Sequence, residues 1–558
     1  MKPPCGSFLE LVREITLTGT DVIYIAPTVA RRYSMNDYKF ENGINGATGD
    51  YLFPQRSTQE IAAIAKNAYI ENQHLNDLKN RARELRDQSK APAAWVDPTD
   101  LANAGWGVIF TETYRGYTLE ALKSEDGLGL LLNHRKQQAS QQFEAYYREC
   151  VYKSGQSKNE FLKAHKVPTS GAVDPDRGMP YYLMIVGNPE TIAYEFQYQL
   201  DVQYAVGRIY FDTLEEYAYY AQSVVRAETG QVDRPRQVSF WGVRNRADEA
   251  TKLSSEKLIK PLSEWLPQKA SGWEFPMLLA EEATKENLSR QINQDSAPAI
   301  LFTASHGMGF PKGDSHQKEF QGSLVCQEWT RFSKFDPETQ VFSAADIKAE
   351  ADFHGLIAFH FACYGLGTPQ FNDFKQRDGE KELAEAPFIA RLPQQLLSHP
   401  KGGALAVIGH VDRAFANSFQ VSGIKQLAVF QSVLKCLIDQ SPVGYAMEFF
   451  NQQYAELASE CNLGIRNDNL NDKEIADFWT GSTNARNYAV FGDPAVRIAV
   501  SRASNDTSST NSKVWFNRSN KPPEANIQQL KDKIKELEQQ VEVLQAENQQ
   551  LREQQAKG

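Results

Sequence analysis

Two residues in this sequence, Cys363 and His306, have the types and positions that nucleophilic catalysis needs. Cys363 ends a nearly unbroken apolar run in GLIAFHFACYG (355–365), and His306 ends an earlier run in AILFTASHG (299–307). A cysteine attacks as the thiolate, and a histidine within hydrogen-bond reach can take the thiol proton and later deliver it to a leaving amine. The pair therefore predicts a Cys/His dyad that cleaves an amide through an acyl-enzyme.

Such a reaction also needs hydrogen-bond donors for the oxyanion. Gly307 follows the histidine and can offer a backbone N–H with no side chain in the way, and the N–H of Cys363 is the natural second donor. Taken singly, a cysteine or a histidine at the end of an apolar strand is usually a packing residue or a satisfied polar group. The combination of His-Gly and Ala-Cys-x-Gly, each after a strand, favours chemistry.

The other histidines and cysteines are weaker candidates. Four further histidines lack a His-Gly pair after an apolar run, and Cys326 lacks a strand-end context. His360 shares the strand of Cys363, and alternation directs its side chain away from that residue. The six cysteines form no CxxC pair and no Cys/His cluster, so we expect no metal, no disulfide framework and no cofactor. The four histidines are His316, His354, His360 and His410.

Short apolar strands that alternate with helices must position the dyad. Strands such as YYLMIVGNP (181–189) and QVSFWGV (237–243) are separated by amphipathic helices such as TLEEYAYYAQSVVRAE (213–228). Continuous apolar strands of this kind indicate an α/β fold with a mainly parallel sheet flanked by helices. Functional residues of such sheets gather beyond the carboxyl ends of the strands, where Cys363 and His306 are expected.

A chain of 558 residues exceeds one ordinary core, so we divide it into five parts. The first is a mostly helical region that we expect to serve regulation or docking and in which we find no chemistry. Two α/β subdomains follow, and the second carries the dyad. A linker rich in Ser, Asn and Thr leads to a C-terminal helix. The parts are residues 1–104, 105–234, 235–500, 501–524 and 525–556.

Composition narrows the function classes. The formal net charge of −10 and the lack of a basic stretch with interleaved aromatics disfavour nucleic-acid binding. No run approaches the roughly 18 apolar residues of a membrane span. The N-terminus has no apolar segment ahead of a small-residue cleavage site, so we expect no signal peptide and a cytoplasmic location.

Several segments resemble a known family. FTASHGMG and FHFACYG are similar to the His-Gly and Ala-Cys motifs of the caspase-like (clan CD) cysteine peptidases. YYLMIVGNP, YAVGRIYFDTLEEYAYYAQSVVRAE, GGALAVIGHVDRAFANSF and YAVFGDPAVRIAV follow the order seen in the gingipain family within that group. The resemblance covers roughly residues 105–500. It implies a caspase/gingipain-like fold and a peptidase with Cys363 as nucleophile and His306 as general base and acid.

The sequence departs from this family pattern in three respects. Phe361 stands where the caspase form has a glutamine. Gingipains carry two acidic residues, one that supports the histidine and one that selects basic substrates, and here only Asp248 and Glu249 are available. Gingipains are secreted, whereas this chain shows no export signal.

Specificity is expected to depend on the segment GHVDRAF (409–415), which follows the next strand and should line the pocket beside the scissile bond. Asp412 would favour a basic substrate residue and Arg413 an acidic one, unless the two only pair with each other. With Asp248 and Glu249 also acidic, we predict cleavage after a basic residue.

The C-terminal helix repeats in heptads. β-branched residues at position a, leucines at d and one asparagine at a favour a parallel two-stranded coiled coil, similar to a leucine zipper. We therefore expect a homodimer, or a partner protein with a matching helix, through residues 525–556. The core positions are Ile527, Leu530, Ile534, Leu537, Val541, Leu544, Asn548 and Leu551.

These observations lead to an intracellular cysteine endopeptidase whose substrate is a protein or peptide, regulated by proteolytic processing or by oligomer or partner formation. Two alternatives stay open, because fold alone does not settle function. One is a catalytically silent scaffold that binds partners, which the intact His-Gly and Ala-Cys motifs argue against. The other is a Cys/His amidase that acts on a small molecule.

Overall fold

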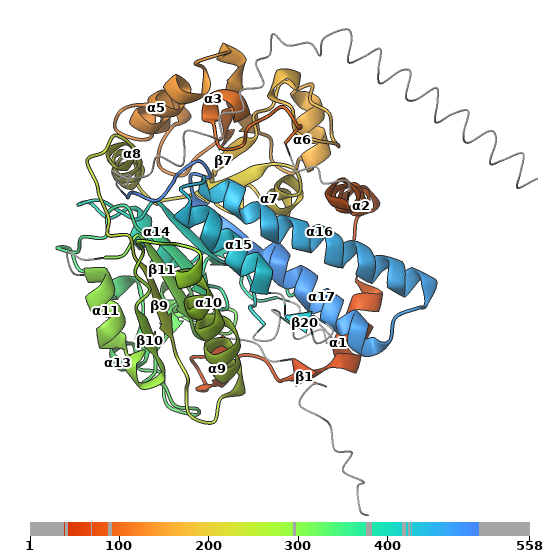
Figure 1. Cartoon of the computed structure of the whole chain (residues 1–558), viewed down its shortest axis with the longest axis vertical. Coiled ribbons are helices and arrows are strands. Elements are labelled where there is room, and N and C mark those ends of the chain that lie inside the picture. Colours follow the sequence, from red (N-terminus) through yellow and green to blue (C-terminus); the bar gives the residue numbers. More distant parts are fainter. Residues whose placement is uncertain are drawn as a thin grey trace, which may run out of the picture.

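The apolar runs of the sequence form one ten-stranded sheet with helices on both faces (Figure 1). A computed structural model describes residues 38–39, 43–68, 70–86, 92–293, 297–374, 382–415, 420–421, 424–425 and 427–500. The sheet has the order β10-β9-β11-β15-β18-β21-β8-β7-β5-β6. Its inner strands are buried at every residue, which explains why they read as continuous rather than alternating apolar runs.

Most neighbouring strands pair in parallel. β10, β9, β11, β15 and β18 form one parallel set, β8, β7, β5 and β6 form another, and β21 pairs antiparallel with β18. The bounds are β5 (Trp106–Thr111), β6 (Tyr147–Tyr152), β7 (Tyr182–Val186), β8 (Ala205–Ile209), β9 (Val238–Gly242), β10 (Met277–Leu279), β11 (Ile300–Ala304), β15 (Ile357–Phe361), β18 (Ala406–His410) and β21 (Tyr488–Gly492).

The helices begin where the sequence supplies caps. A capping box starts α8 (Leu214–Glu228) at Thr213, and another starts α17 (Asp472–Asn487) at Asn471, so that the first backbone N–H groups are satisfied. An aromatic cluster of Phe302, Phe359 and Phe430 joins the sheet to the helices above it. The other principal helices are α5 (Gly129–Ala139), α9 (Glu249–Ser254), α11 (Lys285–Asn293), α14 (Arg391–Leu397), α15 (Leu427–Ile438) and α16 (Val443–Asn467).

The N-terminal region contributes two strands to a second sheet and two helices that pack on α16 and α17. Its strands β2 (Gly43–Asn45) and β3 (Asp50–Tyr51) complete a second, five-stranded sheet of order β14-β13-β12-β2-β3. Within that sheet β2 runs parallel to β12 (Gly307–Gly309), so that Gly43 pairs with Gly307. The helices α1 (Thr58–Asn67) and α2 (Asn72–Arg86) pack on α17 and α16. The remaining strands are β13 (Leu324–Val325) and β14 (Val341–Phe342).

Three buried ion pairs bind this N-terminal region to the rest of the molecule. Arg81 contacts Glu448 at 2.7 Å, Lys39 contacts Asp477, and Asp77 contacts Lys158. All six side chains are buried. Removing one partner of such a pair typically costs about 3–5 kcal/mol, so the N-terminal region is anchored firmly.

The α/β class with a mainly parallel sheet flanked by helices is confirmed. The division into parts at residues 105 and 235 stays a prediction, and the large sheet runs continuously across both α/β subdomains. The linker 501–524 and the coiled coil 525–556 lie outside the described residues. Within the described part of the chain, no helix has the length and apolar character that crossing a membrane requires.

Candidate active site

Four adjacent parallel strands end at one edge of the sheet and present the residues singled out from the sequence. Asp248 follows β9, His306 follows β11, Cys363 follows β15 and Asp412 follows β18. Ile300 of β11 pairs with Ile357 of β15, an offset of 57 that equals the separation of His306 from Cys363. The register therefore brings the histidine and the cysteine to the same level of neighbouring strands.

Gly307 lies directly against the backbone of Cys363. A Cβ atom at position 307 would stand 1.7 Å from the carbonyl oxygen of Cys363 and 3.0 Å from its backbone nitrogen. No side chain fits there, so glycine is required by close approach rather than by an unusual φ angle. The two expected oxyanion donors thus belong to residues in contact.

The thiol of Cys363 is enclosed by backbone. The N–H of Ala414 donates to Sγ at 3.1 Å, and the carbonyl oxygen of Ala414 lies 3.6 Å from the sulfur. On another side, a Cβ at Gly43 would stand 3.4 Å from Sγ. An N–H donor at the sulfur stabilises a thiolate. Cys363 is only 1% exposed, so the thiol is buried in this structure.

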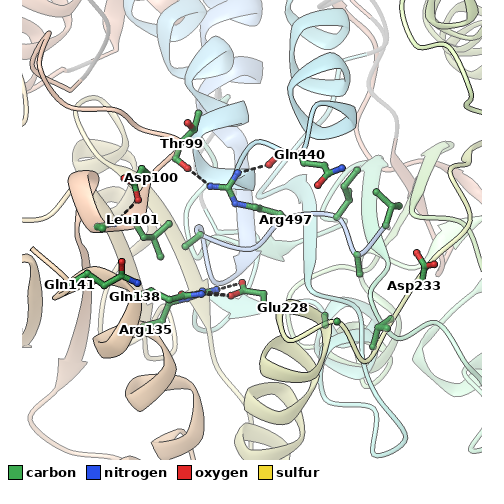
Figure 2. Close-up of a pocket in the computed structure, with 18 residues that line it drawn as sticks. Thr99, Asp100, Leu101, Arg135, Gln138, Gln141, Glu228, Asp233, Gln440 and Arg497 are labelled. Atoms are coloured by element: carbon green, nitrogen blue, oxygen red, sulfur yellow. Dashed lines mark hydrogen bonds and ion pairs between the residues drawn. The ribbon is translucent and has the colours of Figure 1, made fainter. Parts of the chain in front are cut away.

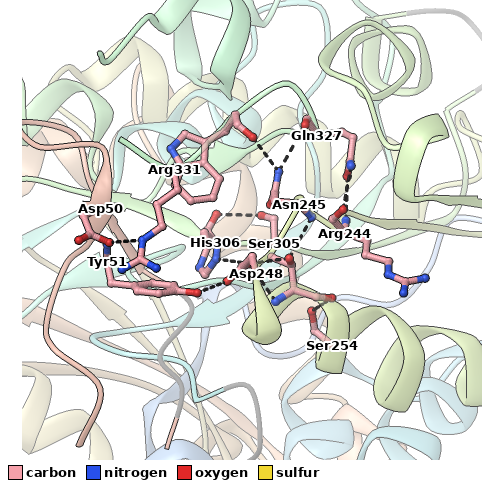
Figure 3. A network of polar contacts seen from close by, with 12 residues as sticks. Asp50, Tyr51, Arg244, Asn245, Asp248, Ser254, Ser305, His306, Gln327 and Arg331 are labelled. Carbon is pink, nitrogen blue, oxygen red and sulfur yellow. Dashed lines mark hydrogen bonds and ion pairs between the residues drawn. The ribbon is translucent and has the colours of Figure 1, made fainter. Parts of the chain in front are cut away.

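His306 is held by a carboxylate and two aromatic rings. Its Nε2 donates to Oδ2 of Asp248 at 2.6 Å, and Figure 3 shows the two side chains facing each other. Tyr51 and Trp329 stand edge-on to the imidazole, with ring centroids 5.8 and 5.7 Å away. Nδ1 is buried and has no hydrogen-bond partner among the described residues. The contact with Asp248 fixes the ring through Nε2 and leaves Nδ1 without a hydrogen bond among the described residues.

Asp248 is itself fixed by several donors. Oδ2 also accepts from the hydroxyl and the N–H of Thr251, at 2.5 and 3.1 Å, because Asp248 is the N-cap of α9. Oδ1 accepts from the hydroxyl of Tyr51. Burial acts to raise the pKa of Asp248, but the charge of His306 and the hydrogen bonds from His306, Thr251 and Tyr51 outweigh it, so the pKa lies below its usual value. The carboxyl group therefore stays ionised.

Strained backbone gathers around these residues. Ala247, Tyr364 and Asp412 have φ angles of 57°, 57° and 80°, in the left-handed region that residues with a side chain seldom adopt. Ala247 precedes Asp248, Tyr364 follows Cys363, and Asp412 follows β18, so all three lie beside the site. Such strain persists where the surrounding structure enforces it, and it is common at functional sites.

The other acidic candidates are placed differently. Glu249 pairs with Lys252 on the surface of α9 and does not contact His306. Asp412 lies 3.8 Å from Nε of Arg413, the mutual pairing that the sequence left open. The Arg413 guanidinium also donates to Asn372 at 2.6 Å.

The expected pocket residues Arg413 and Phe361 both contact aromatic rings. The Arg413 guanidinium lies 3.7 Å from the ring centroid of Phe53. Phe361 is buried in β15, where it packs toward His410 and Phe430 in the core. Its side chain therefore serves the packing of the sheet, because the strand is covered on that face.

Two of the remaining cysteines and two of the remaining histidines are buried, and burial keeps them in their neutral forms. Burial raises the pKa of Cys326 well above its usual value and that of Cys150 to about 12, which disfavours their thiolates. Burial lowers the pKa of His360 to about 4 and that of His410 to about 3, so both stay neutral. His360 contacts Thr303 at 2.8 Å.

His316 and His354 lie in other settings. His316 contacts Asp314 on the surface at 3.0 Å, and His354 contacts the backbone of Ser223 at 2.8 Å. Among the described residues, no group of three or more His, Cys, Asp or Glu side chains could hold a metal ion.

A separate pocket of about 470 Å³ lies between the segment before β5 and the segment after β21 (Figure 2). Arg497 points into it and donates to the backbone carbonyls of Thr99 and Gln440, while Arg135 is bound to Glu228. None of the candidate catalytic residues lines this pocket. The pocket is therefore separate from the candidate active site at the strand ends.

Sequence reasoning missed the residues that reach the site from outside the strand ends. Tyr51 belongs to the N-terminal region, for which no chemistry was expected, and Trp329 belongs to a loop after β13. The available signal near Tyr51 was the glycine-rich segment GINGATGDYLF (43–53), typical of close backbone approach.

Comparison with known proteins gives one family match. A family model described as "Peptidase family C25" matches residues 153–499, more than half of the chain. No curated protein matches the chain.

Two solved structures are similar at low identity. A structure described as "Structure of Protease" has a TM-score of 0.41 and 11% identity over 74% of this chain and 81% of that chain. The "Complex of Porphyromonas gingivalis RgpB pro- and mature domains" has a TM-score of 0.37 and 13% identity over 71% and 80%.

Proposed function

Because this chain belongs to peptidase family C25 and is a cysteine peptidase, we propose that Cys363 is its nucleophile and His306 its general base and acid. The substrate is a protein or peptide. One observation carries the assignment: Nε2 of His306 is engaged by Asp248 and Nδ1 is buried without a partner among the described residues, while the offset of 57 between β11 and β15 equals the separation of His306 from Cys363. A base with this free nitrogen and a fixed ring is what a thiol nucleophile needs.

The reaction follows from these groups. Nδ1 takes the proton of the Cys363 thiol, and Sγ attacks the scissile carbonyl carbon to give a tetrahedral oxyanion. The N–H groups of Gly307 and Cys363 stabilise that oxyanion. The imidazolium returns the proton to the leaving amine as the C–N bond breaks, which leaves a thioester. Water then adds to the thioester carbon while His306 takes a proton from it, and the C–S bond breaks as the imidazolium returns that proton to Sγ, which gives the free thiol and the new carboxyl group.

Asp248 has a supporting role in this scheme. Its carboxylate keeps the proton of His306 on Nε2 and stabilises the imidazolium that forms during acylation, as an orienting carboxylate does in other nucleophile–base pairs. Of the two roles that the family resemblance implies for an acidic residue here, support of the histidine is thus the one that the contacts favour.

The preference for a basic substrate residue stays a prediction, and its carrier is now Asp412, because Asp248 binds His306 and Glu249 binds Lys252. Arg413 would instead select an acidic residue. A peptide library decides between them. Cleavage after Arg or Lys that Asp412→Asn abolishes supports Asp412, and cleavage after Asp or Glu that Arg413→Met abolishes supports Arg413.

The catalytic assignment is tested with purified variants. Cys363→Ala should abolish peptide cleavage, and His306→Ala should do nearly the same, because members of a catalytic unit are not additive. Cys436→Ala, at a partly exposed cysteine on α15, is the matched control and should keep full activity. Full activity in Cys363→Ala refutes the nucleophile. An inactive wild type with every peptide would favour the silent scaffold, and hydrolysis of small amides alone would favour the amidase.

Cytoplasmic action, regulation by proteolytic processing, and pairing through residues 525–556 complete the proposal. Pairing rests on the heptad pattern of residues 525–556.

A further inference from the structure

The hairpin that carries Tyr51 is built into the structure beside the dyad. β2 lies between β12 and β3, with Gly46 donating to Gly309 at 2.8 Å and Leu52 donating to Gly43 at 3.0 Å. Ile44 is fully buried in a small core with Met308. The hairpin is therefore part of the sheet that contains the candidate oxyanion residue Gly307, and it is not a loose covering.

Tyr51 connects this hairpin to the acid that supports the histidine. Its hydroxyl donates to Oδ1 of Asp248, and its ring is edge-on to His306 (Figure 3). Arg331 lies over the other side of the ring, 5.0 Å from its centroid, and is bound to Asp50 at 2.7 Å. Burial, followed by the charge of Asp248, raises the pKa of Tyr51 well above its usual value, so the hydroxyl stays a donor.

The two carboxylate oxygens of Asp248 are thus engaged from different sides. Oδ2 accepts from His306 and Thr251, and among the described residues Tyr51 is the hydrogen-bond donor to Oδ1. Without that hydroxyl, Oδ1 would be a buried, charged acceptor with no donor, which disfavours the present orientation of the Asp248 carboxylate. The carboxyl group would then rotate, or its pKa would rise.

We propose that Tyr51, from the N-terminal region, is a positioning residue for the dyad and acts by holding the Asp248 carboxylate against Nε2 of His306. This inference rests on the proposed function.

Tyr51→Phe tests the inference, because it removes the hydroxyl and keeps the ring. Loss of a hydrogen bond to a charged group should lower kcat about tenfold or more with KM unchanged. The pKa of Asp248 should rise, because a donor that lowers it is lost, so the deficit of Tyr51→Phe relative to the wild type should grow as the pH falls. The groups that face this carboxylate are His306, Thr251 and Tyr51, with the charges of Arg331 and Asp50 behind the tyrosine ring.

Two controls separate positioning from a structural role. Tyr146→Phe removes a hydroxyl that donates to Asp176 at 2.6 Å, away from the site, and should leave kcat and the pH profile unchanged. In an Asp248→Asn background, Tyr51→Phe should have no further effect on kcat, because the two residues act through one contact.

Three results overturn the inference. Tyr51→Phe could have the same kcat as the wild type at every pH, it could lower kcat as much in the Asp248→Asn background as in the wild type, or it could raise the activity. A rise would identify the hairpin as a cover that blocks Cys363. If Tyr51→Phe unfolds, Asp248→Asn is measured alone: it should lower kcat with KM unchanged, and wild-type kinetics of that variant overturn the inference. Activity retained in Cys363→Ala would instead refute the proposed function and leave the role of Tyr51 without a dyad to support.

Discussion

Replacing Gly307 by alanine is the sharpest steric test of the proposed site. The added Cβ would lie 1.7 Å from the carbonyl oxygen of Cys363, and real Cβ contacts do not fall below 3.0 Å, so the separation must grow by at least 1.3 Å. The nearest atoms that have to yield are backbone atoms of Cys363, which cannot rotate away. A displacement of about 1 Å in a catalytic constellation costs about 100-fold in rate, so kcat/KM of Gly307→Ala should fall by about that factor or more.

The matched control is Gly365→Ala, two residues after Cys363. There a Cβ would meet its nearest neighbours, Ala362 and His360, at 3.4 Å, which is an ordinary contact. Gly43→Ala is intermediate, because its Cβ would also stand at 3.4 Å but from Sγ itself, so the fold should be kept and the rate of thiol attack reduced.

The assay is hydrolysis of the best peptide from the library, combined with thermal unfolding of each variant. Overpacking typically costs about 1–3 kcal/mol, so Gly307→Ala should remain folded at low temperature, where its kinetics are measured. If folded Gly307→Ala cleaves the peptide as fast as Gly365→Ala does, then Gly307 does not lie beside the reacting groups and the placement of the oxyanion donors is refuted.

Three further predictions concern stability and assembly. The pKa of Asp248 is lowered in the folded state, so its ionised form stabilises the fold above a pH of about 4, and this contribution is lost as the pH falls further. At neutral pH the free energy of unfolding should therefore be higher for the wild type than for Asp248→Asn. Denaturant titrations at decreasing pH should show this difference shrinking. Arg81→Met removes the guanidinium partner of the buried Glu448 and should lower the free energy of unfolding by about 3–5 kcal/mol, whereas an equal stability of both proteins would show that the pair contributes nothing. Replacing Leu537 and Leu544 by glutamate should give a monomer in light scattering if residues 525–556 pair, and an unchanged mass would exclude that role.

The parts of the molecule that sequence reasoning predicted are those with a local signal. The strands ending at His306 and Cys363 are continuous apolar runs, and a parallel register at an offset of 57 brings their ends together. Asp248 was found as one of two acidic residues, with support of the histidine and selection of the substrate both left open, because the N-cap contact that aims it depends on where α9 begins.

The contacts of Tyr51 with Asp248 and His306 could not be predicted, since they depend on a pairing between strands that are far apart in the chain. β2 joins β12 across more than 250 residues, as the pairing of Gly43 with Gly307 shows. Neither strand has a periodic apolar pattern of its own length, because three residues are too few to display one.

The buried ion pairs of the N-terminal region show that the folded unit extends beyond the residues that match the family. Residues 153–499 match the family, yet Arg81, Lys39 and Asp77 lie before that range and neutralise charges within it. β5, an interior strand of the large sheet, also lies before it. A shortened chain that begins at the family boundary would keep the buried carboxylates of Glu448 and Asp477 without these cations and would open the sheet beside β7. The region that matches the family and the unit of folding therefore have different limits in this protein, and expression of the matching region alone should yield an unfolded product.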